Sequence, residues 1–196
     1  MLITGLSSYW GGRLAQALEG FEQAEAIIGV DASEPTRELD RTEFVKATYE
    51  HGLLARIIRA AEIDTVVDAR LIVNSVVARP RDAHENNIIG TMNILTACAG
   101  PDSPVRRLVF KSSAHYYGSE QDDPAFFRED MRRPHPPRAM IERDIVEAEG
   151  AVAEFAERNP EVEVTVLRFA NVVGPDVDTA FIRLFALPLV PMVLVF

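Results

Sequence analysis

The sequence predicts one α/β domain in which helices cover both faces of a parallel sheet, the doubly wound architecture. Two observations predict this class. Short β-branched runs alternate with longer segments of helical period along the 196 residues. One such run, TVVD at 65–68, is of the type buried on both faces of a sheet. A flavodoxin-like strand order is the alternative, and the first turn of the chain decides between the two.

The elements follow each other in a regular order. Apolar, β-branched runs predict strands at 1–4, 26–30, 44–47, 65–68, 107–113 and 162–169. Apolar residues at helical spacing predict helices at about 11–19, 53–62, 82–99 and 138–158. Ile141, Ile145, Ala148, Val152 and Phe155 form the apolar stripe of the last helix. A polar loop with four prolines separates this helix from the strand at 107–113.

The composition bounds the partners and the compartment. Apolar residues make up 47% of the chain and charged residues 26%, as in ordinary globular proteins. The net charge of −10 argues against a nucleic-acid partner. Cys98 is the single cysteine and no basic leader precedes the first strand, so we expect a cytoplasmic protein. No metal site is predicted, and Lys46 and Lys111 are the two lysines.

The turn after the first strand, TGLSSYWGGRLA at 4–15, has the pattern of a phosphate-binding loop. Gly5 permits a tight turn, and Gly11 allows close packing where a helix starts. The free amides of that helix end then face a pyrophosphate. Ser8 replaces the middle glycine of the pattern, and its hydroxyl could donate to a phosphate oxygen. The context of strand, turn and helix therefore predicts a nucleotide-binding domain.

Asp31 ends the second strand and sharpens this prediction. It lies twenty residues beyond Gly11, where a carboxylate accepts both ribose hydroxyls and repels a 2′-phosphate. This favours NAD over NADP. The alternative role for Asp31 is that of a turn residue in DASEP. Together the loop and Asp31 predict a Rossmann-type NAD-binding domain over residues 1–176.

The segment LFALPLVPMVLVF at 184–196 is apolar but too short for a membrane span, and Pro188 and Pro191 interrupt it. No membrane association is therefore predicted. We interpret residues 177–196 as the start of a truncated C-terminal substrate-binding portion. Our hypothesis is that a further segment covers this apolar surface.

Four segments match, in order, the signatures of one family: TGLSSYWG (4–11), NNIIGTMNIL (86–95), LVFKSSAHYYG (108–118) and LRFANVVGP (167–175). With them the chain resembles the extended short-chain dehydrogenase/reductases, specifically the NAD-dependent epimerase/dehydratase family that modifies nucleotide sugars. The resemblance implies an NAD cofactor and a small-molecule substrate of the nucleotide-sugar class. It also implies a homodimer that forms through the helices at 82–99 and 138–158.

The catalytic set of this family is a Ser or Thr, a Tyr and a Lys. The Tyr exchanges a proton, and the Lys lowers its pKa and holds the nicotinamide ribose. The resemblance assigns the serine to Ser113, for which a strand-end cap is the alternative role. The helix IERDIVEAE superimposes on the family's YGRDKVEAE, which places Ile141 at the tyrosine and Ile145 at the lysine. Because isoleucine carries neither proton nor charge, the usual mechanism cannot run on this helix.

A rebuilt proton-transfer site is one possible substitute. If the strand at 107–113 persists, residues 111, 113, 115 and 117 share one of its faces. Ser113, His115 and Tyr117 could then converge near the cofactor, with His115 as the acid or base. A solvated loop histidine is the alternative for His115.

Other positions are expected to contact the cofactor. Asp68, Ala69 and Arg70 stand in the place of the family's HLAA segment, where Arg70 could meet a phosphate or pair with an acid. Thr48 and Tyr49 replace the pair that cups adenine. The full set of predicted cofactor contacts is Gly5, Ser8, Tyr9, Trp10, Gly11, Asp31, Thr48, Tyr49, Asp68, Ala69, Arg70, Ser112 and Asn171.

Three functions are compatible with these observations. The first is an oxidoreductase, epimerase or dehydratase that acts on a nucleotide sugar with a non-standard active site. The second is a catalytically silent NAD-binding protein that serves as a sensor or scaffold. The third is a structural homologue that no longer binds NAD, which Asp31 makes the weakest of the three.

Overall fold

The computed structural model describes residues 1–73, 78–100, 102–174, 177 and 179–188. Its strands form a six-stranded, wholly parallel sheet in the order β3-β2-β1-β4-β5-β6. Their bounds are β1 (Leu2–Thr4), β2 (Ile27–Asp31), β3 (Thr42–Lys46), β4 (Thr65–Asp68), β5 (Arg107–Ser113) and β6 (Glu163–Phe169). This strand order confirms the Rossmann-type prediction and excludes the flavodoxin-like alternative.

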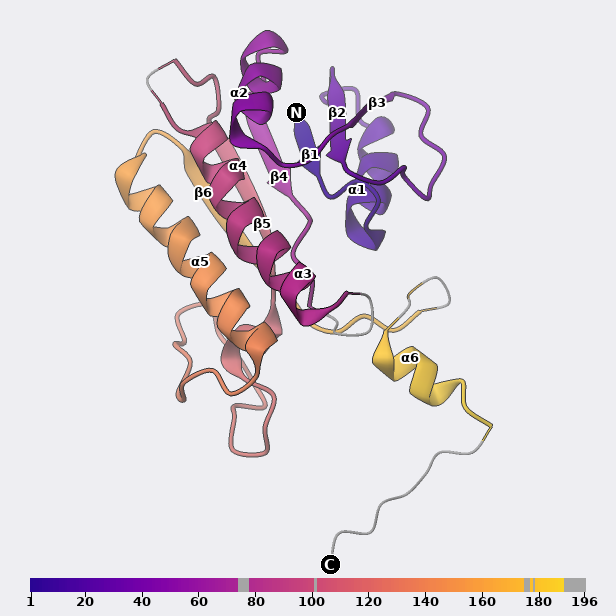
Figure 1. Cartoon of the computed structure of the whole chain (residues 1–196), viewed down its shortest axis with the longest axis vertical. Coiled ribbons are helices and arrows are strands. Elements are labelled where there is room, and N and C mark those ends of the chain that lie inside the picture. Colours follow the sequence, from indigo (N-terminus) through magenta and orange to yellow (C-terminus); the bar gives the residue numbers. More distant parts are fainter. Residues whose placement is uncertain (74–77, 101, 175–176, 178, 189–196) are drawn as a thin grey trace, which may run out of the picture.

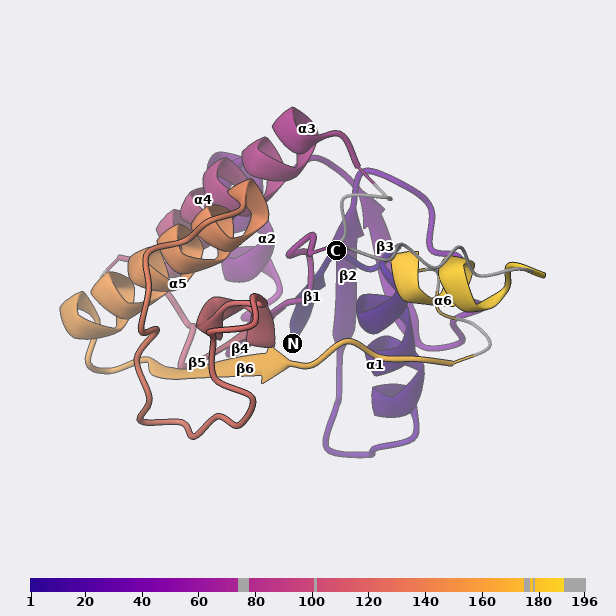
Figure 2. The same ribbon diagram turned by 90° about the horizontal axis from the view of Figure 1, so that it is seen from below.

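Helices lie on both faces of the sheet (Figures 1 and 2). The helices are α1 (Tyr9–Glu19), α2 (His51–Ala60), α3 (Pro80–His84), α4 (Gly90–Cys98), α5 (Met140–Arg158) and α6 (Ala180–Phe185). On one face, α2, α4 and α5 lie side by side, and α1 packs on the other face against β1 and β2. The chain reverses its direction of travel across the sheet between β1 and β4, and ligands of this fold bind at that switch point.

Two apolar clusters hold these layers together. The larger one lies between the sheet and the helices α2, α4 and α5, and it includes Phe110, Leu54 and Ile145. The smaller one joins α1 to the sheet through Ile3, Leu6 and neighbouring residues. Along α5 the predicted apolar stripe is buried at Ile145, Ala148, Val152 and Phe155 and partly buried at Ile141. The packing role that the sequence assigns to this stripe is therefore confirmed.

The helix predicted at 82–99 is not regular. It consists of α3, a π-helical turn at Glu85–Ile89 and α4. The π turn faces Arg70, because Asn86 accepts a hydrogen bond from Arg70 Nη1 through its carbonyl oxygen (2.7 Å). Asn87 exchanges two hydrogen bonds with the backbone of Ile72 (2.8 and 2.9 Å). Such turns widen a helix locally and are frequent at functional sites.

None of the helices within the described ranges has the length and apolarity to cross a bilayer. The helix α6 covers the beginning of the apolar C-terminal run. The remainder of that run, residues 189–196, lies outside the described residues.

Candidate functional site

The loop between β1 and α1 has the backbone of a phosphate-binding turn. Gly5 has a φ of +77°, and a Cβ there would lie 2.9 Å from the Arg70 backbone. A Cβ on Gly11 would collide with the Gly5 carbonyl oxygen. Both positions therefore require glycine, for the reasons that the sequence predicts. Ser8 caps α1, since its Oγ accepts from the Gly11 amide (3.0 Å) and donates to the Gly5 carbonyl (2.6 Å).

The cap leaves two backbone donors at the helix start. The amides of Tyr9 and Trp10 are the first two of α1, and the geometry of an α-helix gives such groups no intrahelical acceptor. Both residues line the cleft described below. Trp10 stacks on Phe169 from β6 with ring centroids 4.6 Å apart. The helix N-terminus thus presents backbone donors and a positive dipole end to an anion in the cleft.

Asp31 lies beside this loop at the carboxyl end of β2, where it is 7% exposed. Its Oδ2 accepts from the Ser7 amide (2.9 Å) and hydroxyl (2.7 Å), and its Oδ1 accepts from the Ser33 amide (3.1 Å). A carboxylate has about four acceptor directions, so these bonds leave capacity for a further donor. The alternative role in the DASEP turn is also present, because the Ser33 contact is a turn contact.

Arg70 fills the space behind the loop. Its guanidinium pairs with Asp68 (2.8 Å) at a side-chain exposure of 2% for both partners. Thr4 Oγ1 also donates to Asp68 (2.9 Å). Of the two roles that the sequence leaves open for Arg70, the structure shows the pairing with an acid. Its Nε is buried without a hydrogen-bond partner among the described residues, so one donor remains for a ligand.

Thr48 and Tyr49 lie on the far side of Arg70. The Arg70 guanidinium covers one face of the Tyr49 ring at 4.6 Å from the centroid. Burial raises the pKa of the Tyr49 phenol, and the charge of Asp31 adds to this effect. Thr48, Tyr49 and Asn86 line a separate depression of about 380 Å³. The aromatic face that the sequence offers to adenine is thus shared with an arginine.

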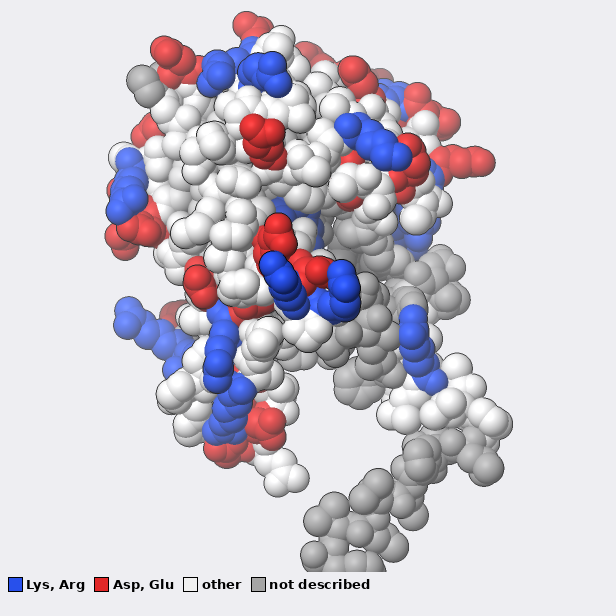
Figure 3. Space-filling model, in the orientation of Figure 1, with Lys and Arg blue, Asp and Glu red and all other residues white. Residues whose placement is uncertain are grey.

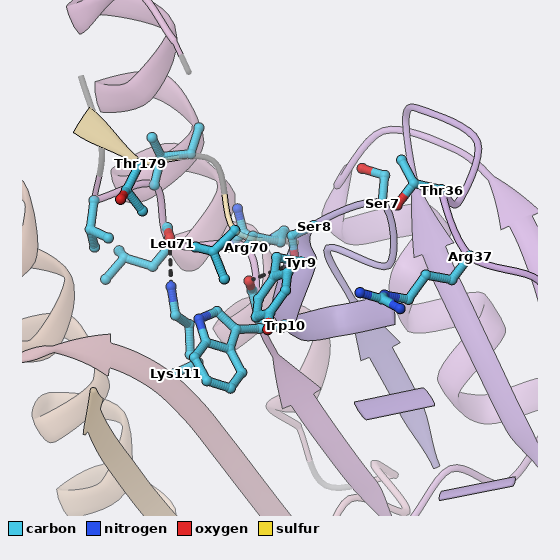
Figure 4. Close-up of a pocket in the computed structure, with 14 residues that line it drawn as sticks. Ser7, Ser8, Tyr9, Trp10, Thr36, Arg37, Arg70, Leu71, Lys111 and Thr179 are labelled. Atoms are coloured by element: carbon cyan, nitrogen blue, oxygen red, sulfur yellow. Dashed lines mark hydrogen bonds between the residues drawn. The ribbon is translucent and has the colours of Figure 1, made fainter. Parts of the chain in front are cut away.

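A cleft of about 790 Å³ lies above the carboxyl ends of β1, β4 and β5 (Figure 4). Its walls come from the phosphate loop, from the segment after β4, from the end of β5 and from the C-terminal segment. The lining residues are Ser7, Ser8, Tyr9, Trp10, Thr36, Arg37, Ala69, Arg70, Leu71, Ile72, Val73, Lys111, Val177 and Thr179. This is the place where dinucleotides bind in folds of this class.

The chain beyond β5 does not continue as a strand. The strand stops at Ser113, and Ala114–Tyr117 form a 3-10 turn that the Ser113 side chain caps. Residues 111, 113, 115 and 117 therefore do not continue on one strand face. Ser113 Oγ and His115 Nδ1 are 2.9 Å apart, so these two are brought together. Burial lowers the pKa of His115, which favours the neutral imidazole.

Tyr117 is separated from this pair by the turn. Its hydroxyl donates to the Arg128 carbonyl (3.0 Å) and accepts from Arg168 Nη1 (2.6 Å), while its ring stacks on Phe127. These contacts tie the polar loop to β6. The expected convergence of Tyr117 with Ser113 and His115 was wrong, because the strand does not persist.

Ser112 and Asn171, two predicted cofactor contacts, do not line the cleft. The Ser112 hydroxyl is buried and donates to Glu149 of α5, which also binds Arg168 of β6 (2.7 Å). The side chain of Ser112 thus points to the helix layer, and a contact with a cofactor would have to come from its backbone. Asn171 follows β6 and is exposed. Their predicted roles stay predictions.

The first turns of α5 are apolar where the resemblance places the reactive groups. Ile145 is fully buried in the larger apolar cluster, and Ile141 packs against its edge. Neither side chain lines the cleft. Lys111 does line it. The sequence places residue 111 on the strand face of Ser113, and that spacing is the signal for its place in the cleft, although no role for it was predicted.

The fold and the cleft define a dinucleotide-binding protein of the Rossmann class. Glycines at the two crowded loop positions, free amides at the start of α1, a carboxylate at the end of β2 and an unpartnered Arg70 Nε fit the pyrophosphate and ribose of such a ligand.

Comparison with known proteins gives the family. The model of the NAD-dependent epimerase/dehydratase family matches residues 1–188. This chain belongs to that family, whose cofactor is NAD. An uncharacterized protein of Mycobacterium tuberculosis is 36% identical over 202 residues, which are 98% of this chain and 52% of that protein. A UDP-glucose 4-epimerase of Halalkalibacterium halodurans is 32% identical over 126 residues, 60% of this chain and 36% of the relative. The chain spans about half the length of its mycobacterial relative.

Solved structures confirm the fold. The UDP-glucuronic acid 4-epimerase of Bacillus cereus in complex with NAD has a TM-score of 0.75 at 23% identity, covering 93% of this chain and 60% of that one. The UDP-glucose 4-epimerase of Thermotoga maritima with UDP-glucose has a TM-score of 0.73 at 24% identity, covering 90% and 57%. At these identities the likeness concerns the fold, which is the Rossmann-type domain of the larger enzymes.

Proposed function

We propose that this chain binds NAD in the cleft between the phosphate loop and the end of β5, and acts on a nucleotide sugar with a non-standard active site. The observation that carries the proposal is the presence of two features at one edge of the sheet. These are the free amides of Tyr9 and Trp10 at the start of α1, and the carboxylate of Asp31 at the end of β2. The amides suit the pyrophosphate and Asp31 suits the adenosine ribose. NAD, when bound, supplies a reversible hydride acceptor.

The substrate class is inferred from relatives. The related proteins from Halalkalibacterium halodurans and Azospirillum brasilense are named UDP-glucose 4-epimerases. The Thermotoga maritima structure contains UDP-glucose. Val177 and Thr179 line the cleft just where the sequence predicts a substrate-binding portion to begin. We therefore propose a small-molecule substrate of the nucleotide-sugar class.

The proton transfer would fall to Ser113 and His115. Their side chains are in hydrogen-bond contact, and His115 is biased toward the neutral form that can accept a proton. A hydroxyl next to a neutral imidazole can pass a proton between a substrate oxygen and the ring. This pair is the substitute for the tyrosine and lysine that Ile141 and Ile145 replace.

A second candidate function is a silent NAD-binding protein, which would act as a sensor or scaffold. The observation in its favour is the complete burial of Ile145 in an apolar cluster, so that the start of α5 is a packing surface. In this candidate the cleft and Asp31 keep their roles, while the Ser113–His115 pair only caps the 3-10 turn.

Titration of the intact chain with NAD tests the binding step. Trp10 is the single tryptophan and lies in the cleft wall, so its fluorescence reports directly on occupation. We expect saturable quenching, confirmed by calorimetry. No response in either measurement at millimolar NAD would exclude both NAD-binding functions.

Incubation with UDP-glucose or UDP-glucuronic acid separates the enzyme from the silent protein. An enzyme would give transient absorbance of reduced cofactor or an altered sugar, whereas the silent protein would give neither. His115→Ala should abolish any turnover, while Tyr117→Phe should retain it, because the Tyr117 hydroxyl is committed to Arg128 and Arg168. Unchanged turnover in His115→Ala would remove the Ser113–His115 site.

We also propose a homodimer through α4 and α5. The face over these helices carries few charges in its middle (Figure 3). Met92 and Ile89 are about half exposed there, and a groove runs between Leu95 of α4 and Phe155 of α5. A dimer would cover these apolar side chains. Sedimentation should show a dimer that Met92→Arg dissociates, and a monomer in the parent chain would contradict it.

The cytoplasm remains the proposed compartment. Cys98 is buried, and burial raises the pKa of its thiol to about 12, so the thiol has no role that would need an oxidising environment. Fractionation of the native source with an antibody to this chain would test the assignment.

A further inference from the structure

Lys111 is the one lysine of the cleft. The other lysine, Lys46, is exposed and pairs with Glu34 (3.1 Å). Lys111 is 7% exposed near the end of β5, and its Nζ donates to the Leu71 carbonyl oxygen (3.0 Å). Figure 4 shows the ammonium in the cleft wall, between Leu71 and the Trp10 ring. It is therefore part of the same wall as the phosphate loop.

The environment of Lys111 is costly for a charge. An ammonium has three donors, and among the described residues its hydrogen bond to the Leu71 carbonyl oxygen uses one of them. Burial lowers the pKa of Lys111 to about 8, and the charge of Asp68 opposes part of that shift. An unbranched apolar side chain such as methionine would fill the same volume without this cost. The packing of the cleft wall thus gives no reason for a lysine here.

The position of Lys111 supplies a reason. In the family signature the lysine comes from the helix, at the place that Ile145 occupies here inside the apolar cluster. Lys111 is two residues before Ser113 on β5, so both side chains belong to the same strand face. An ammonium on that face reaches the cleft from the sheet, while Ser112 between them turns to Glu149 of α5.

We propose that Lys111 provides from strand β5 the cationic cofactor contact that the family's helix lysine would provide, and that its Nζ binds the dinucleotide in the cleft. This inference rests on the proposed NAD binding. Lys111 is accordingly a cofactor-binding residue. When the dinucleotide is present, the ammonium binds it either in place of the Leu71 carbonyl or in addition to it.

A pH dependence follows from this role. A dinucleotide that contacts the Lys111 ammonium favours its protonated form, so the affinity is highest below about pH 8 and falls as the amine loses its proton. The charged groups around it are Asp68 and Arg70, which pair with each other, and Arg37 across the cleft. From α5, Glu149 is bound to Ser112 and Arg168.

Lys111→Met tests the proposal, with Lys46→Met as the matched control. Calorimetry with NAD on the intact chain should show a loss of affinity of about 10- to 100-fold for Lys111→Met. Lys46→Met should stay within about twofold, as expected for an exposed pair. The parent chain should lose about tenfold in affinity between about pH 7 and 9.5, and Lys111→Met should lose this dependence.

The outcomes distinguish a failure of the role of Lys111 from a failure of the proposed NAD binding. Equal affinity and equal pH profiles in Lys111→Met and the parent chain would overturn the role of Lys111 and leave the proposed function intact. A lower affinity with an unchanged pH profile would likewise overturn the charge contact. A parent chain that does not bind NAD at all would overturn the proposed function, and the role of Lys111 with it.

A second measurement leaves Lys111 itself unchanged. Because the chain has two lysines, selective ¹³C labelling of lysine gives two side-chain signals, which Lys46→Arg assigns. Addition of NAD to the parent chain should shift the Lys111 signal and raise its titration midpoint above about pH 8, while Lys46 stays unchanged. A Lys111 midpoint that NAD leaves in place would overturn the proposal.

Discussion

The start of α1 and the start of α5 differ in what they retain from the family pattern. At α1 the loop keeps the glycines at its two crowded positions and leaves two helix amides for an anion. At α5 the resemblance places Ile141 and Ile145 at the positions of the reactive tyrosine and lysine, and both pack on or in the apolar cluster. Features that suit a dinucleotide are therefore present at the start of α1, whereas the start of α5 presents apolar side chains that serve packing.

The two helices differ in whether backbone groups or side chains would make the functional contacts. The α1 site offers backbone amides of Tyr9 and Trp10 to an anion, and these donors do not depend on the side chains of the two residues. Proton transfer instead depends on particular side chains, and a single replacement removes it. Farther along, α5 keeps Glu149, which holds β5 and β6 through Ser112 and Arg168. Glu149 therefore links α5 to two strands of the sheet.

The sharpest way to break this comparison is Ile145→Lys, which restores the family's residue. Ile145 is fully buried, so the new ammonium would enter an apolar cluster without a partner. We expect a loss of roughly 3–5 kcal/mol in the free energy of unfolding. Urea denaturation measures it, and Ile145→Met should cost less than about 1.5 kcal/mol. A tolerated lysine would mean that the start of α5 still has room for a charged group.

The buried Glu149 offers the next largest effect. Glu149→Ala removes the acceptor of Ser112 and Arg168 and leaves a guanidinium, 23% exposed, without its carboxylate. The expected loss is roughly 2–4 kcal/mol in the free energy of unfolding. Glu154→Ala on the same helix breaks an exposed pair with Arg158 and should cost less than about 1 kcal/mol. Equal losses would show that the buried contacts of Glu149 stabilise the fold no more than the exposed pair of Glu154 does.

Asp31→Asn probes the cofactor side. The change removes the charge that suits ribose hydroxyls and repels a 2′-phosphate, so NAD affinity should fall about 10- to 100-fold and the preference for NAD over NADP should shrink. Calorimetry with both dinucleotides measures this. Glu34→Gln, an exposed change nearby, serves as the control. An unchanged NAD to NADP ratio would leave Asp31 with its turn role alone.

Most of the fold could be predicted because it depends on local sequence. The strands at 65–68 and 107–113 have the predicted bounds, since apolar β-branched runs end at polar or turn residues. The π turn could not be predicted. It depends on Arg70 and Ile72, which contact Asn86 and Asn87 across more than a dozen residues of sequence.

The candidate site also has one part that the local sequence predicts and another that depends on tertiary contacts. The loop and Asp31 follow from spacing, whereas the separation of Tyr117 from Ser113 depends on where β5 stops. That end is decided by a serine cap and by the binding of the Tyr117 hydroxyl to Arg128 and Arg168. Such tertiary contacts leave no periodic signal. The strand spacing puts Lys111 on the face of Ser113, but only the tertiary structure places it beside Leu71 and Trp10.

The smallest expected effect concerns the first turns of α5, where His84 of α3 contacts the buried Asp144 (2.8 Å). The hydrogen bond with Asp144, and then its charge, raises the pKa of His84. The stabilisation is therefore complete below about pH 6.5 and is lost as the pH rises through the higher pKa of the folded state. His84→Gln should remove this contribution.

Melting temperatures between about pH 5.5 and 7.5 measure the effect as a difference between the parent chain and His84→Gln. Burial lowers the pKa of His115, which acts in the opposite direction but is common to both proteins and cancels. His51→Gln, an exposed change at the start of α2, should run parallel to the parent chain. If the His84→Gln curve also ran parallel, the charge of Asp144 would not contribute to holding α5 against α3.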